Sequence, residues 1–422
     1  MIDKDLFPYN LAVVAIMKNE EPYVKEWLEY HLLMGVDHFY IYDNGESEEL
    51  KKILKPYIDA EFVTYTPYPG KVRQIEAYNN AIQRFRFECR YMAVIDVDEF
   101  IFPKNSSTIT EIIDSHLDAP TNSAGLEIWI MRFGSSGHEK ADYTKGVLER
   151  FTRRAEFHED SIKCIVNPRR VDFFWTTHFP SYFRGVKPVR VHEYEMVVNH
   201  YHVKSREEFS LKNKRGHGVF NKEDLYNDFE FEVYDKQANN IVDRDALKYR
   251  NTLQIAMTSM GDTIETLMES KKVDYKKIFG KLSDVLTPTL DPKQPLSFFD
   301  YKMENYLICL NLIFSCREKE LIGDKDVEFL LEHTINAIDK SLRAKFIIAD
   351  ADLLLSMLPE ILTQTKFITK IHRKFFEKVI LEYKQALQLG IKENSDLKDW
   401  RKISDLEYIL RMLKSFDAYT QN

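Results

Sequence analysis

Hydrophobic and polar residues follow one another along the first hundred positions in blocks of strand and helix length. Apolar runs of strand length predict strands at Leu11–Met17, His38–Tyr42, Glu61–Tyr65 and Tyr91–Ile95. Amphipathic spacing between these runs predicts helices at Glu21–Met34, Ser47–Ile58 and Arg73–Arg86. Strands and helices that alternate in this order form a parallel sheet with helices on both faces. The first prediction is therefore an α/β domain.

The pattern changes beyond residue 100 and again near residue 286. Further strands are expected at Ala124–Phe133, Ile162–Val166 and Val197–Tyr201. The proline-bearing segment LTPTLDPKQP is typical of a linker, and residues 297–418 carry long amphipathic repeats with almost no Gly or Pro. We expect an α/β domain over residues 1–285, a linker over 286–296 and a C-terminal all-α domain over 297–422.

Composition narrows the class of protein. The net charge is −8, so the chain lacks the positive field of a general nucleic-acid binder, and we expect no nucleic-acid partner. Its four cysteines form no CxxC pair, which fits a reducing compartment better than a disulfide framework. The first ten residues are polar, and no run of about 18 apolar residues occurs. We expect a cytoplasmic protein that can contact the inner face of a membrane peripherally.

The strongest chemical signal is Asp96-Val97-Asp98, directly after the fourth predicted strand. Two carboxylates one residue apart can converge on a hard divalent cation such as Mn²⁺ or Mg²⁺. That cation would neutralise a diphosphate and stabilise a departing nucleotide as a Lewis acid. The alternative is an ordinary solvated loop, which the position after a buried parallel strand disfavours.

Two other strand ends carry polar side chains, and each has a plain structural alternative. Asn19 and Glu20 follow the first strand and can grip a nucleotide, or Asn19 can simply cap the next helix. Asp43 follows the second strand and can bind a base or ribose, or can form a turn with Asn44 and Gly45. Because ligands of such sheets bind beyond the carboxyl ends of the strands, three polar strand ends together indicate a site.

A later segment, NHYHVKS, adds a histidine and a basic stretch. His200 ends a strand-like run and can complete a metal shell as a neutral imidazole. Four basic residues downstream can neutralise phosphate, namely Lys204, Lys212, Lys214 and Arg215. The alternative is a partly exposed histidine beside a solvated helix face. Ser205 and Glu208 have the spacing of a capping box at the start of that helix.

These residues resemble a known family. The blocks VAIMKNEEPYVKEWLEYHLLMGVDHFYIYDNGE, RQIEAYNNAI and MAVIDVDEFIF look like the bacterial relatives of glycosyltransferase family 92, close to family 2. The segments MRFGSSGH, SIKCIVNP and VNHYHVKSREEFSLKNKRG are similar to further blocks of that family. The resemblance covers about residues 10–220 and leaves out the C-terminal part of the chain.

The resemblance implies a GT-A fold, the Rossmann-like fold of nucleotide-diphospho-sugar transferases, with Mn²⁺ or Mg²⁺ as cofactor. It implies that Asp96, Asp98 and His200 bind the metal, with Asp96 also at the diphosphate. It further implies a donor site of Asn19, Glu20, Asp43, Arg73 and Gln74, to which the basic Lys204 is added. A UDP-sugar is the favoured donor, and a glycan or a lipid-linked sugar is the expected acceptor.

Relatives of this kind are inverting enzymes, so the resemblance implies a single displacement in which a carboxylate deprotonates the acceptor hydroxyl. The candidate bases are Glu139, Asp142, Glu156, Glu159 and Asp160, of which Glu159-Asp160 is only a loose match to the Glu-Asp pair of family 2. The histidines His138 and His178 can assist in binding acceptor or metal.

Two other function classes compete with glycosyl transfer in surface polysaccharide synthesis. A metal-dependent nucleotidyltransferase usually has a Gly-rich loop after its first strand, where this chain reads IMKNEEP. A non-catalytic scaffold that uses the helical tail is disfavoured by the intact acids and histidine. The tail itself can pair two copies of the chain or touch anionic lipid through KFITKIHRKFFEK, although a solvated helix face is the plainer reading.

Overall fold

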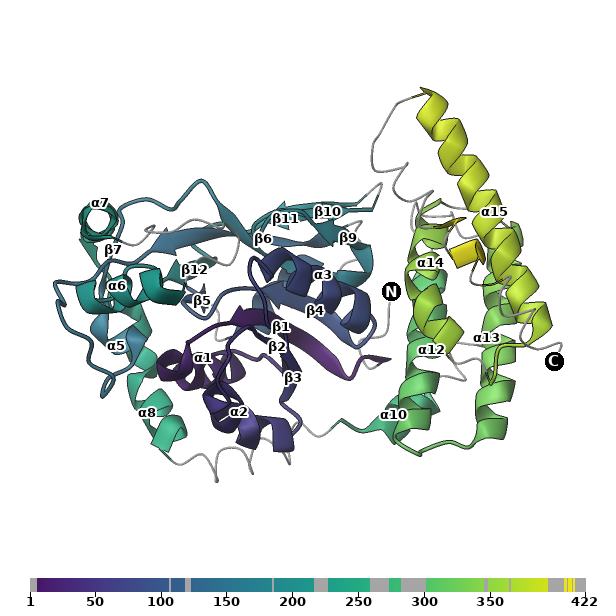
Figure 1. Ribbon diagram of the computed structural model, residues 1–422, viewed down its shortest axis with the longest axis horizontal. Coiled ribbons are helices and arrows are strands. Elements are labelled where there is room, and N and C mark those ends of the chain that lie inside the picture. Colours follow the sequence, from purple (N-terminus) through teal and green to yellow (C-terminus); the bar gives the residue numbers. More distant parts are fainter. Residues whose placement is uncertain are drawn as a thin grey trace. The chain divides into compact units, whose positions relative to one another are not determined.

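The computed structural model describes residues 6–105, 108–117, 123–183, 186–215, 227–258, 273–281, 301–344, 348–363, 366–393, 406–407, 409–411 and 413. The chain divides into two compact units (Figure 1). One unit is Pro8–Val273, and the other joins Asp274–Asn422 with the first seven residues, Met1–Phe7. The expected linker, 286–296, lies outside the described residues.

The first unit begins with the alternating strands and helices that the sequence pattern predicts. In chain order these are β1 (Tyr9–Met17), α1 (Glu21–Leu33), β2 (His38–Asp43), α2 (Glu49–Asp59), β3 (Val63–Pro67), α3 (Gln74–Phe85) and β4 (Cys89–Val94). The predicted elements are confirmed, with boundaries that differ by one or two residues.

The rest of this unit is mixed. Its elements are β5 (Glu99–Pro103), α4 (Ile109–Leu117), β6 (Ser123–Arg132), α5 (Val147–Arg150), β7 (Arg153–Arg154), β8 (Ile162–Val166), η2 (Pro168–Arg170), β9 (Val171–Phe174), β10 (Pro180–Tyr182), β11 (Lys187–Arg190), β12 (Met196–His200), α6 (Arg206–Arg215), α7 (Asp228–Ala238), β13 (Ile241–Val242), η3 (Asp245–Tyr249) and α8 (Arg250–Thr258). The three further strands expected from the sequence correspond to β6, β8 and β12.

The main sheet has the strand order β3-β2-β1-β4-β8-β6-β12-β5, with β11 paired to β6. Strands β3, β2, β1 and β4 are parallel, whereas β8 runs antiparallel to both β4 and β6. Strands β2 and β3 lie on one side of β1, and β4 lies on its other side. The strand order therefore reverses between β1 and β4. Such a reversal opens a crevice at the carboxyl ends of the strands. The α/β class is confirmed, with a mixed rather than wholly parallel sheet.

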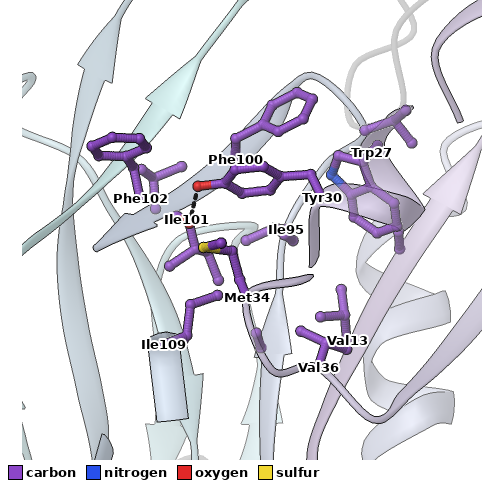
Figure 2. Close-up of a cluster of buried hydrophobic side chains, with 14 of the residues drawn as sticks. Val13, Trp27, Tyr30, Met34, Val36, Ile95, Phe100, Ile101, Phe102 and Ile109 are labelled. Atoms are coloured by element: carbon purple, nitrogen blue, oxygen red, sulfur yellow. Dashed lines mark hydrogen bonds between the residues drawn. The ribbon is translucent and has the colours of Figure 1, made fainter. Parts of the chain in front are cut away.

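Both faces of the sheet are covered, as the sequence pattern predicts. Helices α1 and α2 pack on one face and α3 on the other (Figure 1). On the first face, the Trp27 indole donates to the Glu99 carbonyl at 2.8 Å. The Tyr30 hydroxyl donates to the Ile101 carbonyl at 3.0 Å (Figure 2). Burial of each such ring contributes about 1.5–3 kcal/mol. Helix α1 therefore fixes β5, the strand that directly follows Asp96 and Asp98.

The second unit is helical, as expected for the C-terminal region. It contains α10 (Tyr275–Gly280), α12 (Tyr301–Glu318), α13 (Asp324–Ala344), α14 (Ile348–Thr363) and α15 (Lys370–Glu393). Helix α12 is buried around most of its circumference, and α13 and α14 pack against it. A helix that crosses a bilayer must be both long and strongly apolar, and none of the described helices meets both conditions. The chain's four cysteines are free and buried.

Candidate active site

The polar residues that follow the strands meet at one edge of the sheet. Met17 pairs with Asp43 in the β1–β2 ladder, so β1 and β2 end at the same level. The Ile95 amide donates to the Val14 carbonyl, so the chain leaves β4 beside the same edge. Asp96 and Asp98 therefore lie at the crevice between β1 and β4, where the strand order reverses.

Asp96 accepts three side-chain hydrogen bonds. Its Oδ1 accepts from Gln74 Nε2 at 2.6 Å and from the Tyr78 hydroxyl at 2.8 Å, and its Oδ2 accepts from Lys163 Nζ at 3.0 Å. Burial alone would raise the pKa of Asp96, but the Lys163 ammonium outweighs burial and lowers it. Asp96 is thus held as a carboxylate in a fixed orientation, and Gln74, which was expected in the donor site, is one of its partners.

Lys163 is a buried cation between two carboxylates. Its Nζ lies 3.0 Å from Asp96 Oδ2 and 3.0 Å from Glu99 Oε2, and Glu99 Oε2 also accepts from the Asp96 amide at 2.9 Å. Burial raises the pKa of Glu99 to about 7, against the opposing effect of the Lys163 charge. The pKa of Lys163 would fall on burial, but Asp96 and Glu99 hold it well above its ordinary value.

Asp98 lies between a histidine and a lysine. Its Oδ1 is 3.6 Å from His200 Nε2, and its Oδ2 accepts from Lys212 Nζ at 2.8 Å. Burial would raise the pKa of Asp98, but Lys212 and His200 hold it well below its ordinary value. Burial and the nearby Lys212 and His200 charges lower the pKa of His202, which is therefore neutral.

Asp98, His200 and His202 form a group with the geometry of a metal site. Each can offer one ligand atom, and these atoms all lie within 4.8 Å of one another. One carboxylate oxygen and two imidazole nitrogens are a donor set that suits a divalent transition metal such as Mn²⁺, with water or phosphate in the remaining positions. The residues present therefore fit a metal. Asp96, the other expected ligand, is not part of this group, and its oxygens accept from Gln74, Tyr78 and Lys163.

The segment after His202 is held by a buried network. Ser205 and Glu208 form the predicted capping box, with the Ser205 amide donating to Glu208 Oε2 at 3.1 Å and the Glu208 amide donating to Ser205 Oγ at 3.3 Å. Arg150 donates twice to Glu208, at 2.8 and 2.9 Å.

Lys204 is buried with a left-handed φ of 55°, and its ammonium lies 4.1 Å from the centre of the Tyr23 ring. The charge of Lys204 also contributes to the low pKa of Asp98. Side chains of Lys214 and Arg215 lie outside what the structure describes.

The other expected donor residues follow β1 and β2 or begin α3. Helix α1 takes Glu20, not Asn19, as its N-cap residue, and Asn19 just before it has a left-handed φ of 55°. Asp43 is buried, accepting from the Gly45 amide at 2.7 Å and from the Tyr65 hydroxyl at 2.6 Å. Arg73 lies at the start of α3, where it forms an ion pair with Glu76 and stacks on Tyr68. The turn at Asp43 is therefore real, and it leaves the carboxylate at the sheet edge.

Among the five candidate bases, all of them described residues, Glu159 contacts the group of Asp98, His200 and His202, here called the metal-type group. Its Oε1 lies 4.0 Å from His200 Nδ1. Glu159 also accepts from Arg132 at 2.9 Å and from Ser161 at 3.1 Å. Burial would raise the pKa of Glu159, but the charges of His200 and Arg132 lower it.

The other candidate acids have different surroundings. Glu139 forms an exposed ion pair with Arg206 at 2.9 Å, and Asp142 accepts from the amide of Thr144 in a turn. Asp160 is exposed, as is the side chain of Glu156. The two histidines expected near the acceptor are anchored by backbone carbonyls, His138 by Arg150 and His178 by Ile162, each at 3.0 Å.

Sequence reasoning did not single out Lys163, Tyr78, Glu99 or His202. A signal existed for Lys163, because a lysine in the middle of the apolar strand IKCIV must find a buried counter-charge. A signal also existed for His202, which is two residues from His200. Tyr78 looks like an ordinary apolar position of α3, and only the tertiary structure brings its hydroxyl to Asp96.

Residues 13–254 match the family model described as "Glycosyltransferase family 92". A glycosyltransferase family 92 protein of Ricinus communis is 26% identical over 208 residues, which cover 49% of this chain and 37% of that protein. A galactan beta-1,4-galactosyltransferase of Arabidopsis thaliana is 31% identical over 102 residues, which cover 22% of this chain and 20% of that protein. The matches thus span well under half the length of these relatives. Both relatives are plant proteins, so the expected kinship with bacterial proteins stays a prediction.

A solved structure of 4-diphosphocytidyl-2C-methyl-D-erythritol synthase is similar with a TM-score of 0.24 and 11% identity, covering 38% of this chain and 76% of that one. A likeness at that score carries no argument about activity.

Proposed function

We propose that this chain, which belongs to glycosyltransferase family 92 and is therefore a glycosyltransferase, moves a sugar from a nucleoside-diphosphate donor to a glycan or lipid-linked acceptor with the aid of a divalent cation. The observation that carries the proposal is the convergence of Asp98, His200 and His202 at the carboxyl end of β12, with Asp98 two residues beyond Asp96. We further propose a UDP-sugar as donor, and surface polysaccharide synthesis at the cytoplasmic face of a membrane as the setting.

The residues that would hold the cation are Asp98, His200 and His202. Two imidazoles in the donor set favour Mn²⁺ over Mg²⁺, which prefers a shell of oxygen ligands. When bound, the cation would supply positive charge to the diphosphate as it departs with the nucleotide. Lys204 and Lys212 are buried, and the charges of both act on Asp98, so we assign them to the same charge balance.

The donor would lie along the strand ends. Asp43 presents a carboxylate whose orientation is fixed by Tyr65 and Gly45, and we assign it to the ribose or base. Arg73 and Gln74 start α3 beside it, and we place them toward the donor's sugar and phosphates. Because Asp96 accepts three side-chain hydrogen bonds, we assign it the role of a fixed carboxylate that orients Gln74 and Lys163, and not of a metal ligand.

The general base is the remaining role. Inversion by single displacement needs an ionised carboxylate near the acceptor hydroxyl. Contact with His200 supports Glu159 over Glu139, Asp142 and Asp160. The lowered pKa of Glu159 keeps it ionised at neutral pH, although it also makes the carboxylate a weaker base. Arg132 and Ser161 would hold it in position until the acceptor arrives.

A thermal-shift panel of nucleoside diphosphates, each with and without Mn²⁺, tests the proposal. A ligand that binds only the folded chain raises its melting temperature, so one nucleoside diphosphate should stabilise the protein when Mn²⁺ is present and not in EDTA. Asp98→Ala should abolish this joint stabilisation because it removes the carboxylate ligand.

Asp160→Ala serves as the matched control, since Asp160 is an exposed acid outside the metal-type group. It should keep the Mn²⁺-dependent shift of the wild type. If no nucleotide stabilises the wild-type protein under any metal condition, or if Asp98→Ala responds as the wild type does, the proposed site is wrong.

A further inference from the structure

Two large rings face solvent on the segment that joins β9 to β10. Trp175 is 62% exposed and Phe179 is 39% exposed. Exposed aromatic rings are costly to hydrate, and where they gather in a soluble protein they commonly mark a binding surface. The segment carries the polar residues Thr176, Thr177 and His178 between its two rings, so it is not a continuous apolar patch.

Hydrogen bonds fix this segment in shape. At its start, the Phe174 amide donates to Asn79 Oδ1 at 2.6 Å, and Asn79 Nδ2 donates back to the Phe174 carbonyl at 2.8 Å. Within it, Thr176 Oγ1 accepts from the amides of His178 and Phe179, at 3.2 and 2.9 Å. The rings are therefore presented on an ordered turn, which lowers the entropy cost of binding.

The same contacts place the segment beside the candidate active site. Asn79 follows Tyr78, whose hydroxyl donates to Asp96. His178 is anchored to the start of β8 through the Ile162 carbonyl at 3.0 Å, and the Cys164 thiol donates to the His178 carbonyl at 3.4 Å. Between these two β8 residues lies Lys163, the partner of Asp96. Figure 1 shows β9 lying beside α3, in agreement with this packing.

A third exposed ring comes from the turn before β8. Phe157 is 75% exposed, and its neighbour His158 stacks on Trp129 with ring centres 4.0 Å apart. Trp129 pairs with Ile162 in the β6–β8 ladder, so this turn is fixed to the same end of β8 as His178. Two residues after Phe157 is Glu159, which contacts His200.

We propose that Phe157, Trp175 and Phe179, here called the aromatic rim, bind the acceptor by stacking on its sugar rings, and that this acceptor is an uncharged glycan. The C–H groups on one face of a pyranose carry partial positive charge and pack against the negative face of an aromatic ring. Acidic side chains flank Phe157, with Glu156 and Asp160 exposed on either side of it. Like charges repel across such a surface, so uronic acid chains and anionic lipid headgroups are disfavoured. This inference rests on the proposed function and names the acceptor class of that site.

The test is direct binding of short neutral oligosaccharides of galactose, glucose and mannose to the full chain, without nucleotide or metal. Saturation-transfer NMR would report contact of sugar protons with the protein, and titration would give the dissociation constant. At least one neutral oligosaccharide should bind, and Trp175→Ala should weaken that binding about tenfold or more, the usual effect of losing a central aromatic contact. Phe179→Ala should weaken it less because its ring is more covered.

Tyr194→Ala is the matched control. Tyr194 is 70% exposed but lies before the start of β12, at the opposite end of the strand from His200. The Tyr194→Ala protein should bind the oligosaccharide as the wild type does. Melting temperatures of all three variants would confirm that each is folded.

Several outcomes would overturn the inference. The first three are the absence of binding across the neutral panel, equal binding by Trp175→Ala and the wild type, and a preference for oligogalacturonate. The fourth is a change in tryptophan fluorescence that follows anionic lipid vesicles or protein concentration instead of sugar. Failure here is distinct from failure of the proposed function. A rim that binds no sugar leaves the Mn²⁺-dependent nucleotide shift intact, whereas a site that binds no nucleotide leaves sugar binding at the rim intact.

Discussion

At the scale of single residues, the candidate site is a balance of buried charges. Asp96, Asp98 and Glu99 are paired with Lys163 and Lys212. A buried charge is tolerated only when it is paired and hydrogen bonded, and removing one partner commonly costs about 3–5 kcal/mol. The lysines therefore supply to the carboxylates part of the positive charge that the proposed cation would supply.

Lys212 gives a prediction at this scale. Lys212→Met should lower the melting temperature in EDTA, because Asp98 loses the ammonium that lies 2.8 Å from its Oδ2, whereas His200 is a longer contact at 3.6 Å. The free-energy cost should be about 3 kcal/mol, at the lower end of the range for breaking a buried pair. Mn²⁺ should then stabilise the variant more than it stabilises the wild type, since the cation no longer shares Asp98 with an ammonium.

Differential scanning fluorimetry in EDTA and in Mn²⁺ measures both effects. Lys187→Met, which changes an exposed lysine of β11, is the control and should match the wild type in each buffer. A Lys212→Met protein that is as stable as the wild type in EDTA, or that gains no more from Mn²⁺, would contradict the argument.

At the scale of elements, the hydrophobic pattern predicted the parallel half of the sheet well because three of its four strands, β1, β2 and β4, are largely apolar runs. These strands are buried on both faces, and a strand buried on both faces needs apolar residues at most of its positions. The acids at their ends could be predicted to meet because parallel strands share an edge. The contacts of β8 could not be predicted, since an antiparallel strand inserted between β4 and β6 arises from long-range pairing, and this pairing is what brings Lys163 to Asp96.

Two histidines give a prediction about how the elements hold together. Burial lowers the pKa of His31 in α1 and of His38 in β2, in each case to about 3. Both are neutral in the folded protein, whereas the unfolded chain binds a proton near pH 6.5. Stability is therefore fully present above about pH 6.5 and is lost as the pH falls toward 3, by up to about 1.4 kcal/mol per pH unit for each histidine.

Urea unfolding at a series of pH values, followed by near-ultraviolet circular dichroism, measures this loss. His38→Gln should flatten the pH dependence, because a neutral amide can keep hydrogen bonds to Glu61 and Thr64 without titrating. His116→Gln is the control, since His116 is only partly buried and lies in α4. An unchanged slope in His38→Gln would show that this histidine does not carry the effect.

At the scale of the whole molecule, the sequence predicted two parts and placed all the chemistry in the first. The aromatic rim, the metal-type group and the strand-end residues lie between Asn19 and Lys212, inside the Pro8–Val273 unit. The role of the second unit could not be predicted from the hydrophobic pattern. An amphipathic helix indicates that one of its faces is buried, but it does not indicate the function of the helix. Pairing of two copies and contact with lipid both remain predictions for it.

The division into units yields a last prediction. A chain restricted to residues 8–273 should fold by itself, because this unit has its own hydrophobic core on both faces of its sheet. It should also keep the Mn²⁺-dependent stabilisation by a nucleoside diphosphate, since no residue assigned to the cation or donor lies outside it. Circular dichroism and the same thermal-shift panel, run beside the full chain, measure both properties. A truncated protein that folds but no longer responds to nucleotide would mean that the helical unit contributes to the donor site, and the assignment of that site to the α/β unit alone would have to be abandoned.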